Sequence, residues 1–175
     1  MYCELKTDRL FMRPLDISDL EAVHIYSSDD ENTEFMYWLP RYTKEETLQF
    51  LSMVSDEWKK EKPDFYEFAV ILSGELIGAV SVYLNKEKNI GELGWIINKR
   101  YWKKGYATEA VLELKEFAIN KLKVVKLTAN CDYRNVNSYR LMEKIGLTLE
   151  SDSGTRTYPK SGETVNELTY SMVIN

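Results

Sequence analysis

The chain has 175 residues, of which 44% are hydrophobic and 29% are charged. This length is typical of one domain, so we expect residues 1–175 to form a single domain with its own hydrophobic core. The 23 basic and 28 acidic residues give a net charge of −5, which disfavours a general nucleic-acid-binding role.

The cysteine content, the histidine content and the hydropathy disfavour three further classes of protein: disulfide scaffolds, membrane-spanning proteins and metal-binding proteins. Cys3 and Cys131 are too few for a disulfide scaffold, and with no visible signal peptide we expect a cytoplasmic protein. No apolar run is long enough to span a bilayer, so no membrane partner is expected. His24 is the one histidine, and without a Cys/His cluster we expect no metal site.

Hydrophobic periodicity and turn residues predict a mixture of strands and helices in chain order. Asp16 or Ser18 can cap the first helix, and Thr43 with Glu46 forms a capping-box pattern for the second. Gly146 ends the last helix. The expected strands cover residues 5–13, 65–72, 76–84, 90–97, 124–129, 147–151 and 165–174. The expected helices cover residues 19–27, 43–61, 105–122 and 135–144.

Two features of the first third bear on ligand binding. Residues 27–34 are polar and acidic and predict a loop. The five large apolar residues 35–39 (FMYWL) that follow would either line a substrate pocket or fill the core.

The stretch from Trp95 to Ala110 carries the strongest functional signal. It starts as an apolar strand, passes through the basic turn Lys103-Lys104-Gly105 and continues as a helix. A helix that begins at such a turn leaves unpaired backbone N–H groups, which favour an anion such as a phosphate. Gly105 lets the backbone approach a ligand closely. From this pattern alone, a plain turn with solvated lysines is an equal alternative.

Together with its neighbours, this stretch resembles the GNAT family of N-acetyltransferases, in particular the branch of ribosomal-protein N-terminal acetyltransferases. The likeness covers nearly the whole chain and depends on the order and spacing of its pieces. The resemblance implies an α/β fold with a mixed, mostly antiparallel central sheet of about seven strands, flanked by helices, with a splayed parallel strand pair that holds acetyl-CoA. The pieces are Leu5–Pro14 (LKTDRLFMRP), Gly91–Ile97 (GELGWII), Tyr101–Ala110 (YWKKGYATEA), Asn135–Ser138 (NVNS) and Glu143–Leu147 (EKIGL).

The resemblance also implies acetyl-CoA as cosubstrate. The family's turn follows the pattern Gln/Arg-x-x-Gly-x-Gly/Ala and holds the pyrophosphate with backbone amides, whereas this chain has Trp102 at the first position. The pantetheine arm pairs with the splayed strand as an additional strand would. The cofactor-binding residues implied are Trp95, Ile96, Ile97, Lys103, Lys104, Gly105, Tyr106, Ala107, Thr108, Asn135 and Ser138.

Acetyl transfer to an amine needs a proton acceptor for the ammonium and a donor for the departing sulfur. We expect Glu92 to be the base, with Glu67 a weaker candidate, although an ion-paired strand glutamate is equally compatible with the sequence. Many relatives use a Tyr as the donor four residues after the Ser, but this chain has Met142 there. Ser138 is therefore expected to act instead, unless its hydroxyl only bonds a backbone carbonyl.

These observations predict an acetyl-CoA-dependent N-acetyltransferase that modifies a primary amine on a protein N-terminus or a small molecule by direct attack on the thioester. The alternative is a non-catalytic acyl-CoA-binding module acting as a sensor or partner, which Met142 favours. A covalent route through Cys131 is disfavoured because no histidine lies near it in sequence. Acidic residues 29–34 hint at a cationic acceptor, and both a monomer and a homodimer are compatible with the sequence.

Overall fold

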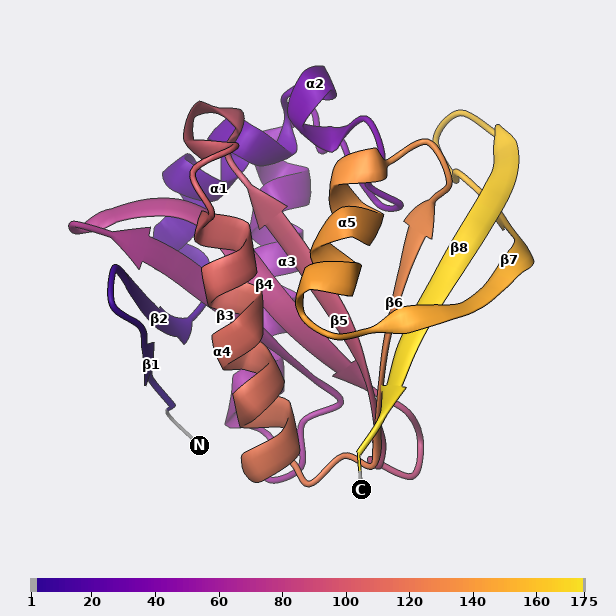
Figure 1. Cartoon of the computed structure of the whole chain (residues 1–175). Coiled ribbons are helices and arrows are strands. Elements are labelled where there is room, and N and C mark those ends of the chain that lie inside the picture. Colours follow the sequence, from indigo (N-terminus) through magenta and orange to yellow (C-terminus); the bar gives the residue numbers. More distant parts are fainter. Residues whose placement is uncertain (1–2, 175) are drawn as a thin grey trace.

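Eight strands form one mixed sheet in the computed structural model, which describes residues 3–174 (Figure 1). Their order is β1-β2-β3-β4-β5-β6-β8-β7, and in this part of the chain only β5 and β6 are parallel neighbours. The strands are β1 (Leu5–Lys6), β2 (Leu10–Pro14), β3 (Phe65–Leu72), β4 (Glu75–Leu84), β5 (Ile90–Ile97), β6 (Lys126–Asp132), β7 (Thr148–Thr157) and β8 (Thr164–Val173). The expected fold class is confirmed, with one strand more than expected.

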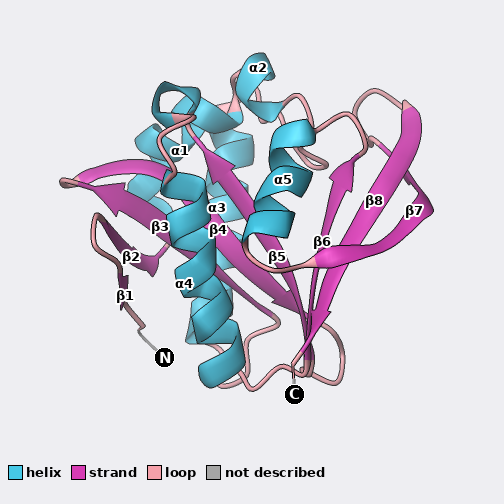
Figure 2. Ribbon diagram, viewed as in Figure 1, coloured by secondary structure: helices cyan, strands magenta, loops and turns pink. Residues whose placement is uncertain are grey.

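Helices cover both faces of the sheet (Figure 2). α4 packs on β2, β4 and β5, and α5 packs beside it on β6 and β8, while α1 and α3 cover the opposite face. None of the helices within residues 3–174 has the length and apolar composition needed to cross a membrane. The helices are α1 (Leu20–Ser27), α2 (Asp30–Thr33), α3 (Lys44–Lys59), α4 (Tyr106–Asn120) and α5 (Val136–Lys144), with 3-10 turns η1 (Ile17–Asp19) and η2 (Lys99–Tyr101).

Local sequence explains the two long helices. α3 begins at the predicted capping box, in which Glu46 N–H donates to Thr43 Oγ1 (3.2 Å) and Thr43 N–H donates to Glu46 Oε2 (3.1 Å). Leu51 and Val54 of α3 are fully buried, whereas Leu48 is 40% exposed. α4 buries Leu114 and Phe117 against the sheet, and burial of each large apolar side chain contributes about 1.5–3 kcal/mol.

The strand predicted over residues 5–13 is wrong as one element, because the chain reverses after β1. Thr7 makes the reversal: its backbone N–H donates to the Leu10 carbonyl (3.0 Å), and its Oγ1 accepts from Leu10 N–H (3.0 Å). β1 and β2 therefore pair antiparallel as a short hairpin. The alternation of residues 5–13 continued through this turn, so periodicity alone did not reveal it.

Two other expected boundaries are also corrected. Residues 27–34 are not all loop, because the Asp29 side chain accepts from Asn32 N–H and caps the four-residue helix α2. The strand expected over residues 147–151 extends to Thr157 as β7, at the edge of the sheet. An edge strand can be solvated on one side, so its polar sequence did not predict a strand.

The parallel pair β5–β6 separates part-way along its length. Its register runs from Ile90 opposite Lys126 to Glu92 opposite Thr128 and then stops. Beyond that point β5 stays paired with β4 as far as Ile97, and β6 stays paired with β8. One edge of β5 from residue 93 to residue 97 therefore has no strand partner among residues 3–174, and this splayed gap confirms the feature expected from the family resemblance.

Close contact between β4 and β5 depends on Gly78. A Cβ at this position would lie 2.2 Å from the Ile96 carbonyl oxygen and 2.8 Å from the Ile97 Cα, both backbone atoms of β5. We expect Gly78→Ala to lower the free energy of unfolding by about 1–3 kcal/mol or more in urea denaturation. Gly94→Ala is the matched control, because its added Cβ would meet only the Ser81 hydroxyl, at 2.6 Å, and that side chain can turn away. Equal losses for the two variants would contradict this account.

Candidate active site

The free edge of β5 is the first component of the site. It includes three residues that the sequence assigned to the cofactor, Trp95, Ile96 and Ile97. Trp95 and Ile96 are half-buried, and Ile97 is buried against the core. Because buried backbone N–H and C=O groups are almost always paired, an unpaired strand edge is suited to a ligand that offers strand-like amides.

The second component is the start of α4. Gly105 is its N-cap, with φ of +82°, and Lys103 also has a positive φ of +61°. No side chain of the described residues caps this helix, and its first backbone hydrogen bond runs from Glu109 N–H to the Gly105 carbonyl (3.0 Å). The N–H groups of Tyr106, Ala107 and Thr108 therefore lie ahead of the helical ladder, at the positive end of the helix dipole.

By contrast, α3 and α5 both begin with side-chain caps. Asn135 accepts from Ser138 N–H (3.2 Å) at the start of α5, as the Thr43 capping box does for α3. The uncapped start of α4 is exposed beside the two lysines. Lys104 is turned back toward η2, where its Nζ donates to the Arg100 carbonyl (3.2 Å), whereas Lys103 is exposed. An anion fits this arrangement without displacing a cap.

Trp102 has a role that the sequence did not reveal. Its indole Nε1 donates to the Ile97 carbonyl at 2.7 Å, so the turn is tied to the end of β5. Asn32 of α2 donates to the same carbonyl (3.2 Å) and accepts from Lys99 N–H (2.6 Å). The Ile97 carbonyl therefore joins the turn before α4 to the segment between α1 and α3. Neither contact had a signal in the sequence.

The third component is the start of α5. Figure 1 shows α5 beside α4, where β5 and β6 diverge. Burial raises the pKa of the Cys131 thiol of β6 to about 11, although Arg156 and the Ser138 side chain favour its ionised form. A protonated thiol is a weak nucleophile, which further disfavours a covalent cysteine route. Met142, at the position where the family resemblance implies a Tyr, is fully buried in the core.

Two glutamates lie on the sheet face that α1 and α3 cover. Glu92 is exposed on β5 opposite Tyr83, at the point where the β5–β6 gap opens. Glu67 is 7% exposed on β3, and its carboxylate accepts a hydrogen bond from the Tyr83 hydroxyl (3.3 Å). Opposite residues of paired strands share a face, so the row Glu67–Ser81–Gly94 leads from Glu67 to the free edge of β5.

The environment of Glu67 perturbs its ionisation strongly. Burial raises the pKa of this carboxyl from its ordinary value of 4.5 to about 7, although Tyr83, Arg41 and Ser81 each favour the ionised form. Arg41 lies over the Phe50 ring, 4.0 Å from its centroid. A carboxyl that titrates near neutral pH is suited to accept a proton, and Glu67, expected only as the weaker candidate, therefore becomes as strong a candidate as Glu92.

Residues 35–42 pack against the β7–β8 hairpin and do not fill the core. Trp38 is 67% exposed, and the Tyr37 ring lies 6.5 Å from that of Tyr158. Lys160 Nζ donates to the Pro40 carbonyl and contacts Glu46 Oε1 (3.4 Å). This segment therefore bridges the start of α3 and the hairpin, and it places aromatic side chains at the surface.

Contacts within the chain involve three of the four carboxylates in the acidic segment 29–34, but they include only one positive charge, that of Lys99. Lys99 Nζ pairs with Asp29 at 2.7 Å and Glu31 at 2.8 Å. Asp30 accepts from the Tyr42 hydroxyl at 3.1 Å. The segment therefore stays net negative, and the cationic acceptor expected from these residues stays a prediction. Among residues 3–174, no group of three or more His, Cys, Asp or Glu side chains is arranged to hold a metal ion.

This geometry combines a splayed parallel strand pair with an open helix start, which suits a ligand that has both an amide-bearing arm and a diphosphate. Comparisons with known proteins agree. Residues 9–148 match the Acetyltransferase (GNAT) domain family, and the chain belongs to this family of acetyltransferases. It is 32% identical to the uncharacterized N-acetyltransferase YnaD of Bacillus subtilis over 174 residues, which cover 97% of this chain and 96% of YnaD.

The chain is also similar to solved structures of acetyltransferases. The crystal structure of a GNAT-family acetyltransferase from Bacillus anthracis superposes with a TM-score of 0.82 at 30% identity, covering 98% of both chains. RimL, a ribosomal alpha-N-protein acetyltransferase in complex with coenzyme A, superposes with a TM-score of 0.81 over 98% of both chains. At 15% identity, RimL shows a shared fold alone.

The raised pKa of Glu67 predicts how stability depends on pH. The folded state holds this proton up to about pH 7 and the unfolded chain releases it near 4.5, so stability falls as the pH rises through this window. Glu67→Gln is neutral at every pH, so its Tm relative to wild type should rise by about 5 °C between pH 5 and pH 8. Differential scanning fluorimetry measures this, with Asp56→Asn, 70% exposed on α3, as control. Parallel pH curves for Glu67→Gln and wild type would contradict it.

Proposed function

We propose that residues 1–175 act as one N-acetyltransferase domain that transfers the acetyl group of acetyl-CoA to a primary amine by direct attack on the thioester. The observation that carries the proposal is the free edge of β5, which leads through η2 into the uncapped start of α4. RimL, with coenzyme A bound, shares this fold. Acetyl-CoA contains both a diphosphate and an amide-bearing arm, which these two features fit.

In this proposal each part of the cofactor meets a defined part of the chain. The diphosphate lies against the N–H groups from Gly105 to Thr108, with Lys103 beside them. The pantetheine arm lies along Trp95–Ile97 as an additional strand and reaches Asn135 and Ser138 of α5. A backbone N–H of Ile96 or Ile97 stabilises the negative charge that develops on the thioester oxygen.

The chemistry needs two proton movements. A carboxylate, Glu92 or Glu67, takes one proton from the ammonium, because only the neutral amine can attack. Nitrogen then bonds to the thioester carbon, the C–S bond breaks, and the second amine proton passes to the sulfur, so that CoA leaves as its thiol. In this proposal the hydroxyl of Ser138, at the start of α5, donates a hydrogen bond to this sulfur. Holding amine and thioester together supplies much of the remaining acceleration.

The acceptor enters from the face that carries Glu67 and Glu92, near the aromatic segment 35–42. A protein N-terminus and a small amine are both candidates, and the segment 29–34, in which Lys99 neutralises one of four carboxylates, is compatible with a cationic acceptor. Because the buried Met142 occupies the position of the expected Tyr donor, a non-catalytic acyl-CoA-binding module is the alternative to be tested.

We expect calorimetry to show acetyl-CoA binding, and a free-thiol assay to show CoA release with at least one class in a panel of N-terminal peptides, polyamines and small amines. Calorimetry tests the binding site and the thiol assay tests turnover. No binding would remove the proposal. Binding without thiol release above hydrolysis for any amine would instead support the non-catalytic module.

Variants then assign the proton acceptor. We expect Glu67→Gln or Glu92→Gln, whichever removes the base, to lower kcat/KM at pH 7 by roughly a hundredfold. If Glu67 is the base, wild-type kcat/KM rises as the pH rises through about 7, and this limb is absent in Glu67→Gln. Asp56→Asn serves as the control that leaves activity unchanged. Activities within about threefold of wild type for Glu92→Gln, Glu67→Gln and Ser138→Ala would show that none of these assignments is right.

A further inference from the structure

We propose that Arg9 is a positioning residue for the diphosphate site: it neutralises and immobilises Glu109, so that the start of α4 stays open and positive for the phosphates of acetyl-CoA. This inference rests on the proposed function and deepens it. It also gives a role to the N-terminal sequence Leu5–Pro14, which carried the family resemblance without a function.

Arg9 lies in the turn between β1 and β2 and contacts the turn Lys103–Gly105 directly. Its Nε and NH2 groups each lie 2.6 Å from Glu109 Oε2, and its NH1 donates to the Lys104 carbonyl at 3.1 Å. The guanidinium also stacks over the Tyr106 ring, 4.6 Å from its centroid. A Cβ built on Gly105 would lie 3.4 Å from Arg9 NH2, so the guanidinium is next to the N-cap.

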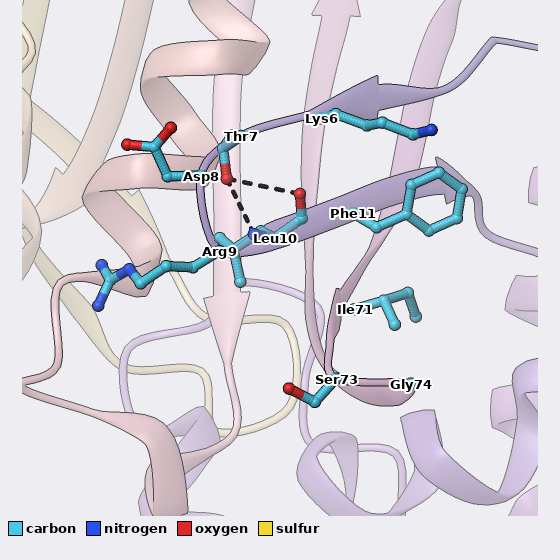
Figure 3. A pocket seen from close by; sticks show the side chains of 9 residues that line it. All are labelled: Lys6, Thr7, Asp8, Arg9, Leu10, Phe11, Ile71, Ser73 and Gly74. Atoms are coloured by element: carbon cyan, nitrogen blue, oxygen red, sulfur yellow. Dashed lines mark hydrogen bonds between the residues drawn. The ribbon is translucent and has the colours of Figure 1, made fainter.

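The hairpin turn holds Glu109 with two further donors. Thr7 Oγ1 and the Arg9 backbone N–H both donate to Glu109 Oε1, the latter at 3.0 Å. Figure 3 shows the turn itself, with Arg9 extending away from Lys6 and Phe11, and Thr7 bonded to Leu10. Both carboxylate oxygens of Glu109 are therefore occupied, and its side chain is only 18% exposed.

Glu109 poses an electrostatic problem for an anion site. A carboxylate in the first turn of a helix is favoured by the same partial positive charge that favours a phosphate. Left free, it would compete for the helix start and repel the diphosphate. Burial raises the pKa of Glu109, but hydrogen bonds from Thr7 and Arg9 outweigh this and lower it, so the group stays ionised. Arg9 cancels that charge, and Lys103 and Lys104 then leave the turn net positive.

The geometry requires arginine at this position. The planar guanidinium engages Glu109 and the Lys104 carbonyl at once, while its face covers Tyr106. A lysine ammonium carries the charge but cannot make these contacts together. An open groove lies beside Thr7, Gly105 and Glu109, and its lining includes the acidic residues Asp8, Glu113 and Glu116, so neutralising Glu109 removes one of several negative charges near the start of α4.

We expect Arg9→Ala to raise the Kd and KM for acetyl-CoA about tenfold while kcat stays within about twofold. With acetyl-pantetheine, which lacks the diphosphate, Arg9→Ala should match wild type. The double variant Arg9→Ala/Glu109→Gln should regain most of the lost acetyl-CoA affinity, because it removes the uncompensated charge. Glu109→Gln alone, which leaves Arg9 in place, should bind acetyl-CoA as tightly as wild type or a few-fold more tightly.

Each contrary result overturns the inference in a recognisable way. Wild-type affinity in Arg9→Ala, or weaker binding in Glu109→Gln, would show that the pair does not control the site. If Arg9→Ala loses acetyl-CoA affinity and the double variant Arg9→Ala/Glu109→Gln does not regain it, Arg9 would be a direct phosphate ligand. An equal loss with acetyl-pantetheine would mean a general structural role. If the wild-type protein does not bind acetyl-CoA, the proposed function is wrong as well. Failure of the proposed function is therefore distinguishable from failure of the Arg9 inference alone, in which the wild type still binds.

Discussion

Pairing between β5 and β6 stops after Glu92 and Thr128, and the rest of the site depends on this early end. Each strand is fully held on its other edge, β5 by β4 and β6 by β8, so the two can diverge without loss of the sheet. The cost is a strand edge without a partner, which a folded protein keeps where something else supplies the hydrogen bonds. The close contact at Gly78 fixes β5 in this position.

The helices turn this gap into a two-part site. β5 continues through η2 into the turn at Lys103–Gly105, so the free edge and the open N–H groups of α4 belong to one continuous segment. α5 lies on the same face as α4, whereas Glu67 and Glu92 lie on the opposite face. A ligand held along β5 would therefore be reached from two sides of the sheet, with the proposed phosphate-binding groups on one side and the proposed proton acceptors on the other.

Much of this could be predicted because the signals were local. The bounds of β3 and β5, the capping box at Thr43 and the open turn at Gly105 are all written in neighbouring residues. The hairpin at Thr7 escaped notice because a side-chain hydrogen bond, and not a glycine or proline, reverses the chain. The helix α2 and the strand β7 were missed for a similar reason, since a short capped helix and a solvated edge strand have weak periodicity.

The contacts that shape the site were the least predictable. Burial of Glu67 depends on β3, β4 and Arg41 coming together, and no pattern along the chain records that. Arg9 and Glu109 are 100 residues apart in sequence, and their pairing arises only when the β1–β2 hairpin meets α4. Residue types could suggest an anion site and a base, but the partners that tune them come from tertiary packing.

The Ile97 carbonyl, which accepts from both Trp102 and Asn32, constrains how this protein can change its preference for acceptors. The segment between α1 and α3, near which we propose that the acceptor enters, shares this anchor with the turn Lys103–Gly105. A transplanted loop without a counterpart of Asn32 would leave Trp102 as the one side-chain donor to this oxygen and would also remove the acceptor of Lys99 N–H. Redesign of selectivity in this chain is therefore safest within residues 35–42, where the backbone can vary while Asn32 is retained.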